Sequence, residues 1–180
     1  MSSRFERLEA HTVFEGAIVD VMEGEFRHED GETVTRKWVA HPGSVAIVAH
    51  DGEHVYLVAQ PREAVGEDAL LELPAGKLDE EGESPLETAK RELAEEIGKQ
   101  AEHWESLGSF FTSPGFSDEE VYLFLATGIS DLAERPAVEE NERIDVEVRP
   151  LADLDAILAE TKDSKTLIGL NRLRDRLARG

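Results

Sequence analysis

The residues most able to do chemistry are three glutamates within the run RELAEE at positions 91–96. Glu92, Glu95 and Glu96 are spaced so that they share one face of a helix, where like charges repel by roughly 0.2–0.5 kcal/mol per pair. A divalent cation among them would remove this repulsion, because hard ions such as Mg²⁺ prefer carboxylate oxygens. The alternative is a solvated acidic face, since 40 of the 180 residues are Asp or Glu.

A helix with defined ends must carry these glutamates. Ser84, Pro85 and Glu87 have the form of a capping box with proline at the first helical position, and Gly98 is suited to end the helix. Its apolar residues recur every three or four positions and predict a core-facing stripe: Leu86, Ala89, Leu93 and Ile97. The acidic face therefore adjoins a buried one.

Composition limits the classes of partner. A net charge of −21 argues against nucleic acid and anionic membranes, and no apolar run approaches the roughly 20 residues that span a bilayer. The absence of cysteine excludes disulfides and thiolate metal sites and is compatible with the cytoplasm, where we expect this protein. The acidic excess has a second interpretation, a saline habitat.

The pattern of elements predicts one α+β domain. Asp30-Gly31 and Asp51-Gly52 are turn signals between strands, and the second pair predicts a central hairpin. The predicted strands are residues 12–20, 32–40, 44–50, 54–60, 70–74, 104–112, 121–127 and 144–148, and the predicted helices besides the capped one are residues 151–158 and 164–177. This order favours a mixed sheet packed against helices.

Three segments resemble one known family. From Glu83, seven residues lead to Arg91 and then to RELAEEIG, which resembles the Nudix box, although six residues instead of five precede Glu83 after Gly76 and Lys99 replaces an aliphatic residue. ELPAGKL at 72–78 and SPGFSDE at 113–119, with Pro114 sixteen positions after Gly98, resemble the ADP-ribose pyrophosphatase branch. The resemblance covers roughly residues 10–170.

The resemblance implies an architecture. It predicts a Nudix-type α/β/α sandwich with a mixed β-sheet at residues 43–180, preceded by an N-terminal antiparallel sheet at residues 1–42. We expect this N-terminal part to belong to the same domain and to mediate a homodimer.

The resemblance also implies a reaction, the hydrolysis of a nucleoside diphosphate sugar, ADP-ribose, to AMP and ribose 5-phosphate. The expected cofactor is Mg²⁺ or Mn²⁺. Its implied ligands are the Ala75 carbonyl, Glu92, Glu96 and Glu142. Glu140 is the implied base that deprotonates water, with a solvated acidic loop as the alternative for that segment. Glu95 is implied as a catalytic residue that acts as a metal ligand or a water-mediated partner, and Glu83 as an outer ligand.

Three further residues complete the predicted site. Arg91 lies within helical reach of Glu87 and Glu95, so we expect it to hold the carboxylates in place. The resemblance implies that Trp38 stacks on adenine and that Arg62 contacts the substrate, although a tryptophan in a strand also serves as packing.

Two other functions stay open. The substrate is alternatively another nucleoside diphosphate sugar, such as ADP-glucose or GDP-mannose. The chain is alternatively a sensor that binds ADP-ribose without hydrolysing it, but the intact set of Glu92, Glu95 and Glu96 argues against binding alone.

Overall fold

The computed structural model describes residues 4–16, 19–134, 136 and 143–179. The chain forms two compact units, one made of Met1–Gly43 with Phe111–Glu120 and the other of Ser44–Phe110 with Val121–Gly180. Each unit is described by itself below.

The first unit is a three-stranded antiparallel sheet in the order β1-β2-β3. Its strands are β1 Phe5–Phe14, β2 Asp20–His28 and β3 Thr33–Ala40. The predicted N-terminal antiparallel sheet is confirmed, but the single strand predicted at residues 12–20 is wrong. Those residues include the end of β1 and the first residue of β2, and β1 is exposed along its whole length, so burial imposes no apolar alternation on it.

The segment Phe111–Glu120 joins this first unit by pairing with β3. Val39 donates its backbone N–H to the Phe116 carbonyl at 2.8 Å and accepts from the Asp118 N–H at 3.2 Å. The N–H groups of Phe116 and Ser117 both bond to the Ser113 carbonyl, which closes the predicted turn. The loop with Pro114 is thereby fixed against β3.

The second unit is built on a mixed sheet whose main path runs β10-β5-β4-β9-β8. Its strands are β4 Ser44–His50, β5 His54–Arg62, β6 Glu67–Glu72, β7 Ala75–Lys77, β8 Lys99–Phe111, β9 Glu120–Asp131 and β10 Asp145–Pro150. Strand β4 pairs in parallel with β9 and antiparallel with β5. Strand β6 pairs antiparallel with β5, and β7 pairs antiparallel with β4. The hairpin predicted at Asp51-Gly52 is the β4–β5 connection.

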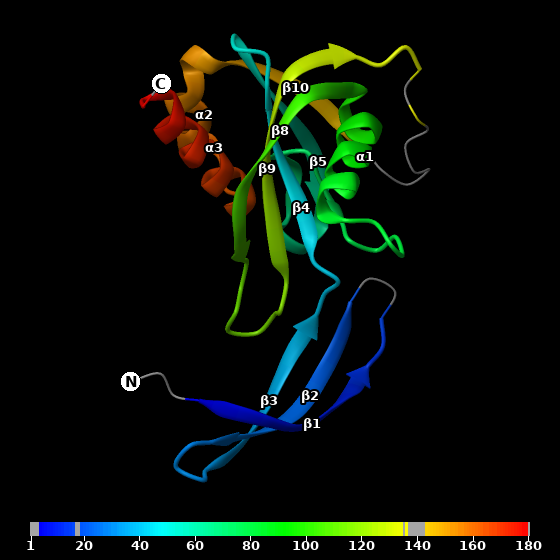
Figure 1. Ribbon diagram of the computed structural model, residues 1–180, viewed down its shortest axis with the longest axis vertical. Helices are drawn as coiled ribbons and strands as arrows, with labels where there is room; N and C mark the ends of the chain where they lie inside the picture. Colours follow the sequence, from blue (N-terminus) through cyan, green and yellow to red (C-terminus); the bar gives the residue numbers. More distant parts are fainter. Residues whose placement is uncertain (1–3, 17–18, 135, 137–142, 180) are drawn as a thin grey trace. The chain divides into compact units, whose positions relative to one another are not determined.

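Helices cover both faces of this sheet, as Figure 1 shows for α1 on one side and α2 and α3 on the other. The helices are α1 Pro85–Ile97, α2 Leu154–Glu160 and α3 Ser164–Leu177, with short 3₁₀ turns at Glu63–Val65 and Leu151–Asp153. Along β4, Val45 and Ile47 share a core cluster with Leu93 of α1, whereas Ala46 shares the other cluster with Leu170 of α3. This alternation makes β4 the buried centre of the predicted sandwich.

Helix α1 begins and ends where its sequence predicts. The Ser84 hydroxyl accepts from the Glu87 N–H at 3.4 Å, and the Glu87 carboxylate accepts from the Ser84 N–H at 2.8 Å. Gly98 ends the helix in the left-handed region at φ 66° and donates to the Ala94 carbonyl. Both ends are thus set locally.

A short crossing between β6 and β7 brings the next strand against α1. Glu72 pairs with Val58 of β5, and only a few residues later Gly76 pairs with Val45 of β4. Between them the Pro74 carbonyl accepts from the Ile47 N–H at 2.8 Å, which anchors the turn before Ala75.

No helix in the described ranges is long and apolar enough to cross a membrane.

Candidate active site

Arg91 of α1 gathers three of the glutamates. Its Nη1 donates to Glu92 at 2.8 Å and to Glu95 at 2.9 Å, and its Nε lies 3.3 Å from both oxygens of Glu83 in the preceding loop. Burial alone would lower the pKa of Arg91, but these carboxylates outweigh it and raise the pKa well above its ordinary value. Arg91 therefore stays charged and fixes the acidic face.

One expected contact of Arg91 is wrong. Glu87 does not bind it among the contacts of the described residues, because its carboxylate accepts instead from the N–H and hydroxyl of Ser84. Glu83 takes the place expected for Glu87. Helical spacing could not indicate this pair, since Glu83 lies before the helix begins.

Glu96 ties the acidic face to β7. It is only 3% exposed, and its carboxylate accepts from the Ala75 N–H at 2.9 Å. Burying a carboxylate is costly unless it is hydrogen-bonded or paired. The hydrogen bond from Ala75 offsets part of this cost, and the burial distinguishes Glu96 from the solvated acidic residues of the surface. The predicted ligands Glu96 and Ala75 are thus brought into direct contact.

Glu92 packs against the same strand. A β-carbon built on Gly76 would lie 2.0 Å from Cδ of Glu92, so the missing side chain of Gly76 leaves room for the carboxylate at this position. The Glu92 side chain is 13% exposed and lies one helical turn before Glu96. In β7, Ala75 therefore contacts Glu96, and Gly76 lies against Glu92.

The carboxylate oxygens of Glu92 and Glu96 beside Ala75 fit a divalent cation that binds together with an anionic ligand. Within residues 4–16, 19–134, 136 and 143–179, no three histidine, cysteine, aspartate or glutamate side chains form a ready-made metal cage. Mg²⁺ needs none, because it is usually held by one or two carboxylates with phosphates and water. Arg91 Nη2 is buried without a hydrogen-bond partner in that part of the chain, so its N–H groups can donate to a water or ligand oxygen.

Arg62, the predicted substrate contact, is held by the buried carboxylate of Glu72. Its Nε donates to Oε1 at 2.6 Å and its Nη2 to Oε2 at 2.8 Å, while its side chain stays 45% exposed. Lys165 of α3 also donates to Glu72 Oε2. Sequence reasoning placed Glu72 in a motif but gave it no role, and it missed Lys165, which lies 93 positions away.

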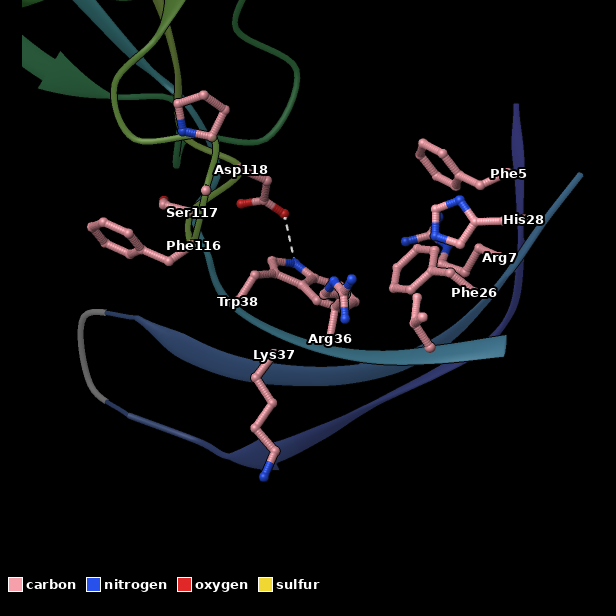
Figure 2. Close-up of a pocket in the computed structure, with 13 residues that line it drawn as sticks. Phe5, Arg7, Phe26, His28, Arg36, Lys37, Trp38, Phe116, Ser117 and Asp118 are labelled. Carbon is pink, nitrogen blue, oxygen red and sulfur yellow. Dashed lines mark hydrogen bonds between the residues drawn. The ribbon is translucent and has the colours of Figure 1, made fainter. Parts of the chain in front are cut away.

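Trp38 lies in a pocket of the first unit. The cavity has a volume of about 480 Å³. It is lined by Phe5, Arg7, Phe26, His28, Val34, Arg36, Lys37, Trp38, Pro114, Gly115, Phe116, Ser117 and Asp118. Figure 2 shows the Trp38 indole N–H directed at Asp118, to which it donates at 3.0 Å, while Lys37 extends away from the other labelled side chains. Trp38 also lies edge to face with Phe26.

The predicted base Glu140 and the predicted ligand Glu142 lie outside the described residues. The structure therefore places Ala75, Arg91, Glu92, Glu95 and Glu96 together, and Arg62 is close enough to Glu96 for the carboxylate to help Glu72 raise the pKa of Arg62.

Comparison with known proteins matches these features to one family. The model of the NUDIX domain matches residues 39–168, which include the whole acidic helix. An ADP-ribose pyrophosphatase of Mycobacterium tuberculosis strain H37Rv is 42% identical over 150 residues, covering 83% of this chain and 72% of that protein. A methanol dehydrogenase activator of Bacillus methanolicus is 37% identical over 179 residues, covering 97% and 96%.

The fold has a close match among solved structures. The crystal structure of an ADP compounds hydrolase superposes with a TM-score of 0.83 at 21% identity, covering 97% of this chain and 95% of that one. At this identity the likeness bears on the fold alone. It agrees with the two sheets and three helices described above.

Proposed function

The chain belongs to the NUDIX family, and from this premise we propose that it hydrolyses the pyrophosphate bond of ADP-ribose to AMP and ribose 5-phosphate. The observation that carries the proposal is the contact of Glu96 with the Ala75 N–H at 2.9 Å, beside the three glutamates that Arg91 binds. The 42% identical ADP-ribose pyrophosphatase supports the choice of substrate. The proposed place of action is the cytoplasm.

Mg²⁺ or Mn²⁺ is the proposed cofactor, held by Glu92, Glu96, Glu142 and the Ala75 carbonyl. When bound, such ions neutralise the pyrophosphate oxygens and lower the pKa of the attacking water. Arg91 keeps the carboxylates of Glu92 and Glu95 aligned by its charge-assisted hydrogen bonds. The acidic face is thereby prepared before substrate arrives.

The remaining roles fall to residues of the chain itself. Glu140 accepts the proton of the attacking water. Arg62 binds a phosphate, since a guanidinium suits phosphate oxygens. Glu72 occupies its Nε and Nη2, which leaves Nη1 for the substrate. Glu140→Gln should reduce kcat about a hundredfold if it is the base. An unaltered kcat in this variant means that another group takes the proton.

The pocket around Trp38 is the proposed adenine site. Its aromatic rings offer stacking surfaces, and stacking on a base contributes roughly 1–3 kcal/mol. Trp38→Ala should raise KM for ADP-ribose about tenfold or more, and Trp38→Phe should recover most of the loss. Equal KM values for the three proteins would assign Trp38 to packing.

We propose a homodimer formed through β1. This strand is exposed throughout, and Leu8 and Phe14 are 36% and 62% exposed, which is unusual for apolar residues on a long edge strand. Light scattering should give twice the chain mass of 20.0 kDa. Leu8→Glu, which lies outside the adenine pocket, should give monomers.

An assay of ADP-ribose, ADP-glucose and GDP-mannose with and without Mg²⁺ tests the main proposal. We expect AMP from ADP-ribose with clear preference, only with the ion present. Glu96→Gln should lower kcat at least a hundredfold, whereas Glu102→Gln, whose side chain is 77% exposed on β8, should not change it. Preference for another sugar would replace the substrate, and tight binding of ADP-ribose without turnover would favour the sensor.

The likeness to the methanol dehydrogenase activator over nearly the whole chain favours a second candidate, the activation of a partner dehydrogenase. Wild-type protein and Glu96→Gln should be added to a methanol dehydrogenase assay. Stimulation by the wild-type protein alone would link activation to hydrolysis. No stimulation by either protein would remove this candidate.

A further inference from the structure

A buried charge network joins the start of α3 to the proposed phosphate-binding arginine. Glu72 is 0% exposed, and its two oxygens accept both hydrogen bonds of Arg62 and one from Lys165. Lys165 is itself largely buried, with 15% of its side chain exposed, and it also donates to Asp163 at 2.9 Å. Two carboxylates and two cations thus balance each other.

The same few residues of α3 hold the chain just before Ala75. Asp163 caps the helix by accepting from the N–H of Thr166 at 2.9 Å and from its hydroxyl at 2.6 Å. The Thr166 hydroxyl oxygen accepts in turn from the N–H of Leu73 at 2.7 Å. Glu72 and Leu73 are therefore both fixed by α3, immediately before the crossing to β7.

Lys165 restricts the orientation of the carboxylate that orients Arg62. A carboxylate bound by one guanidinium alone can rotate together with it, whereas a second cation on Oε2 fixes the plane of the carboxylate. Burial alone would raise the pKa of Glu72, but Arg62 and Lys165 outweigh it and lower the pKa. Glu72 consequently stays ionised when the site is at work.

We propose that Lys165 is a positioning residue for substrate binding, which acts through Glu72 to aim the Arg62 guanidinium at a phosphate of the nucleoside diphosphate. This inference rests on the proposed function, in which Arg62 binds phosphate. Lys165 does not touch the substrate. Its contribution is to reduce the conformational freedom that Arg62 loses on binding.

The test compares Lys165→Met, Lys165→Arg and a matched control, Lys162→Met. Lys162 also pairs with a β6 glutamate, Glu67, but its side chain is 69% exposed. We expect Lys165→Met to raise KM for ADP-ribose about tenfold with kcat changed less than twofold, as for the loss of a charge-assisted contact in the ground state. Lys165→Arg should keep KM within about threefold of wild type, and Lys162→Met should not change it.

A double-variant cycle separates positioning from general damage. Arg62→Ala should raise KM, and adding Lys165→Met to it should have little further effect, because both changes remove one interaction. Binding of ADP-ribose without divalent ion, measured by calorimetry, should weaken in parallel. Where Lys165→Met does not fold, Lys165→Gln replaces it, since glutamine keeps a donor without the charge.

The outcomes separate the two layers of the proposal. If Arg62→Ala leaves KM unchanged, the phosphate-binding role of Arg62 fails and this inference fails with it. If Arg62→Ala raises KM but Lys165→Met does not, Arg62 keeps its role and the positioning role of Lys165 is overturned. A Lys165→Met enzyme with a lower melting temperature but wild-type KM would also make Lys165 merely structural.

Discussion

A β-carbon added to Gly76 would lie 2.0 Å from both Cδ and Oε1 of Glu92. Strand β7 therefore approaches α1 so closely that the proposed metal ligand occupies the space of a missing side chain. The position of the Glu92 carboxylate is set by the strand as much as by the helix that carries it.

Gly76→Ala should accordingly reduce kcat about a hundredfold, because a displacement near 1 Å in a reacting group has effects of this size. Activity and melting temperature should be measured together. Gly52→Ala is the control, since Gly52 has a positive φ of 99° with nothing within 4 Å of an added β-carbon. It should lose about 1–2 kcal/mol of stability from backbone strain and keep its kcat. Wild-type kcat in Gly76→Ala would show that Glu92 moves without consequence.

Replacing Arg91 by lysine tests whether its several bonds matter. A lysine cannot reach Glu83, Glu92 and Glu95 with the fixed fork that Arg91 uses. We expect kcat to fall about tenfold and the Mg²⁺ concentration that gives half-maximal activity to rise. Kinetics over a range of Mg²⁺ concentrations measure both, with the exposed neighbour Lys90→Ala as control. An unchanged Mg²⁺ dependence would contradict the aligning role.

The capping box should account for part of the stability of the second unit. Ser84→Ala removes the hydroxyl that accepts from the Glu87 N–H, which should cost about 1 kcal/mol in urea unfolding. Ser130→Ala, an exposed position in β9, should cost less than about 0.5 kcal/mol. Equal losses in the two variants would mean that tertiary packing alone sets the start of α1.

Glu72 should make stability depend on acid pH. Its folded pKa lies below the ordinary value of 4.5, so its stabilisation is present above about pH 4.5 and is lost as pH falls through the folded pKa. Glu72→Gln should be less stable than wild type by about 3 kcal/mol at pH 7, as expected for a broken buried pair. The difference should shrink below pH 4.5 in urea unfolding at a series of pH values. A difference that is constant with pH would contradict the assignment.

Local signals were sufficient for elements whose ends are set by nearby residues. Helix α1 starts at its capping box and stops at Gly98, and α3 spans the predicted residues 164–177. The β4–β5 hairpin follows from Asp51-Gly52. In each case a turn or cap residue forms its bonds within a few positions, so the sequence alone determines the boundary.

Signals of this kind were absent where exposure or distance decides the structure. Strand β2, which contains Gly24 between two glutamates, has no apolar alternation to mark it. The partnership of Glu72 with Lys165 joins residues 93 positions apart, and nothing in their spacing indicates it. The acidic face of α1 was predictable, but its attachment to Ala75 through Glu96 depends on where the sheet places β7.

The parallel pairing of β4 with β9 also bears on how the chain folds. Ser44 lies beside Val121 and Ala49 beside Ala126, so the innermost strand acquires a neighbour made 77 positions later. Closing so long a loop is entropically costly and slows folding. During synthesis the apolar β4 must wait for most of the polypeptide to leave the ribosome, and fragments that end before β9 should aggregate through its open side.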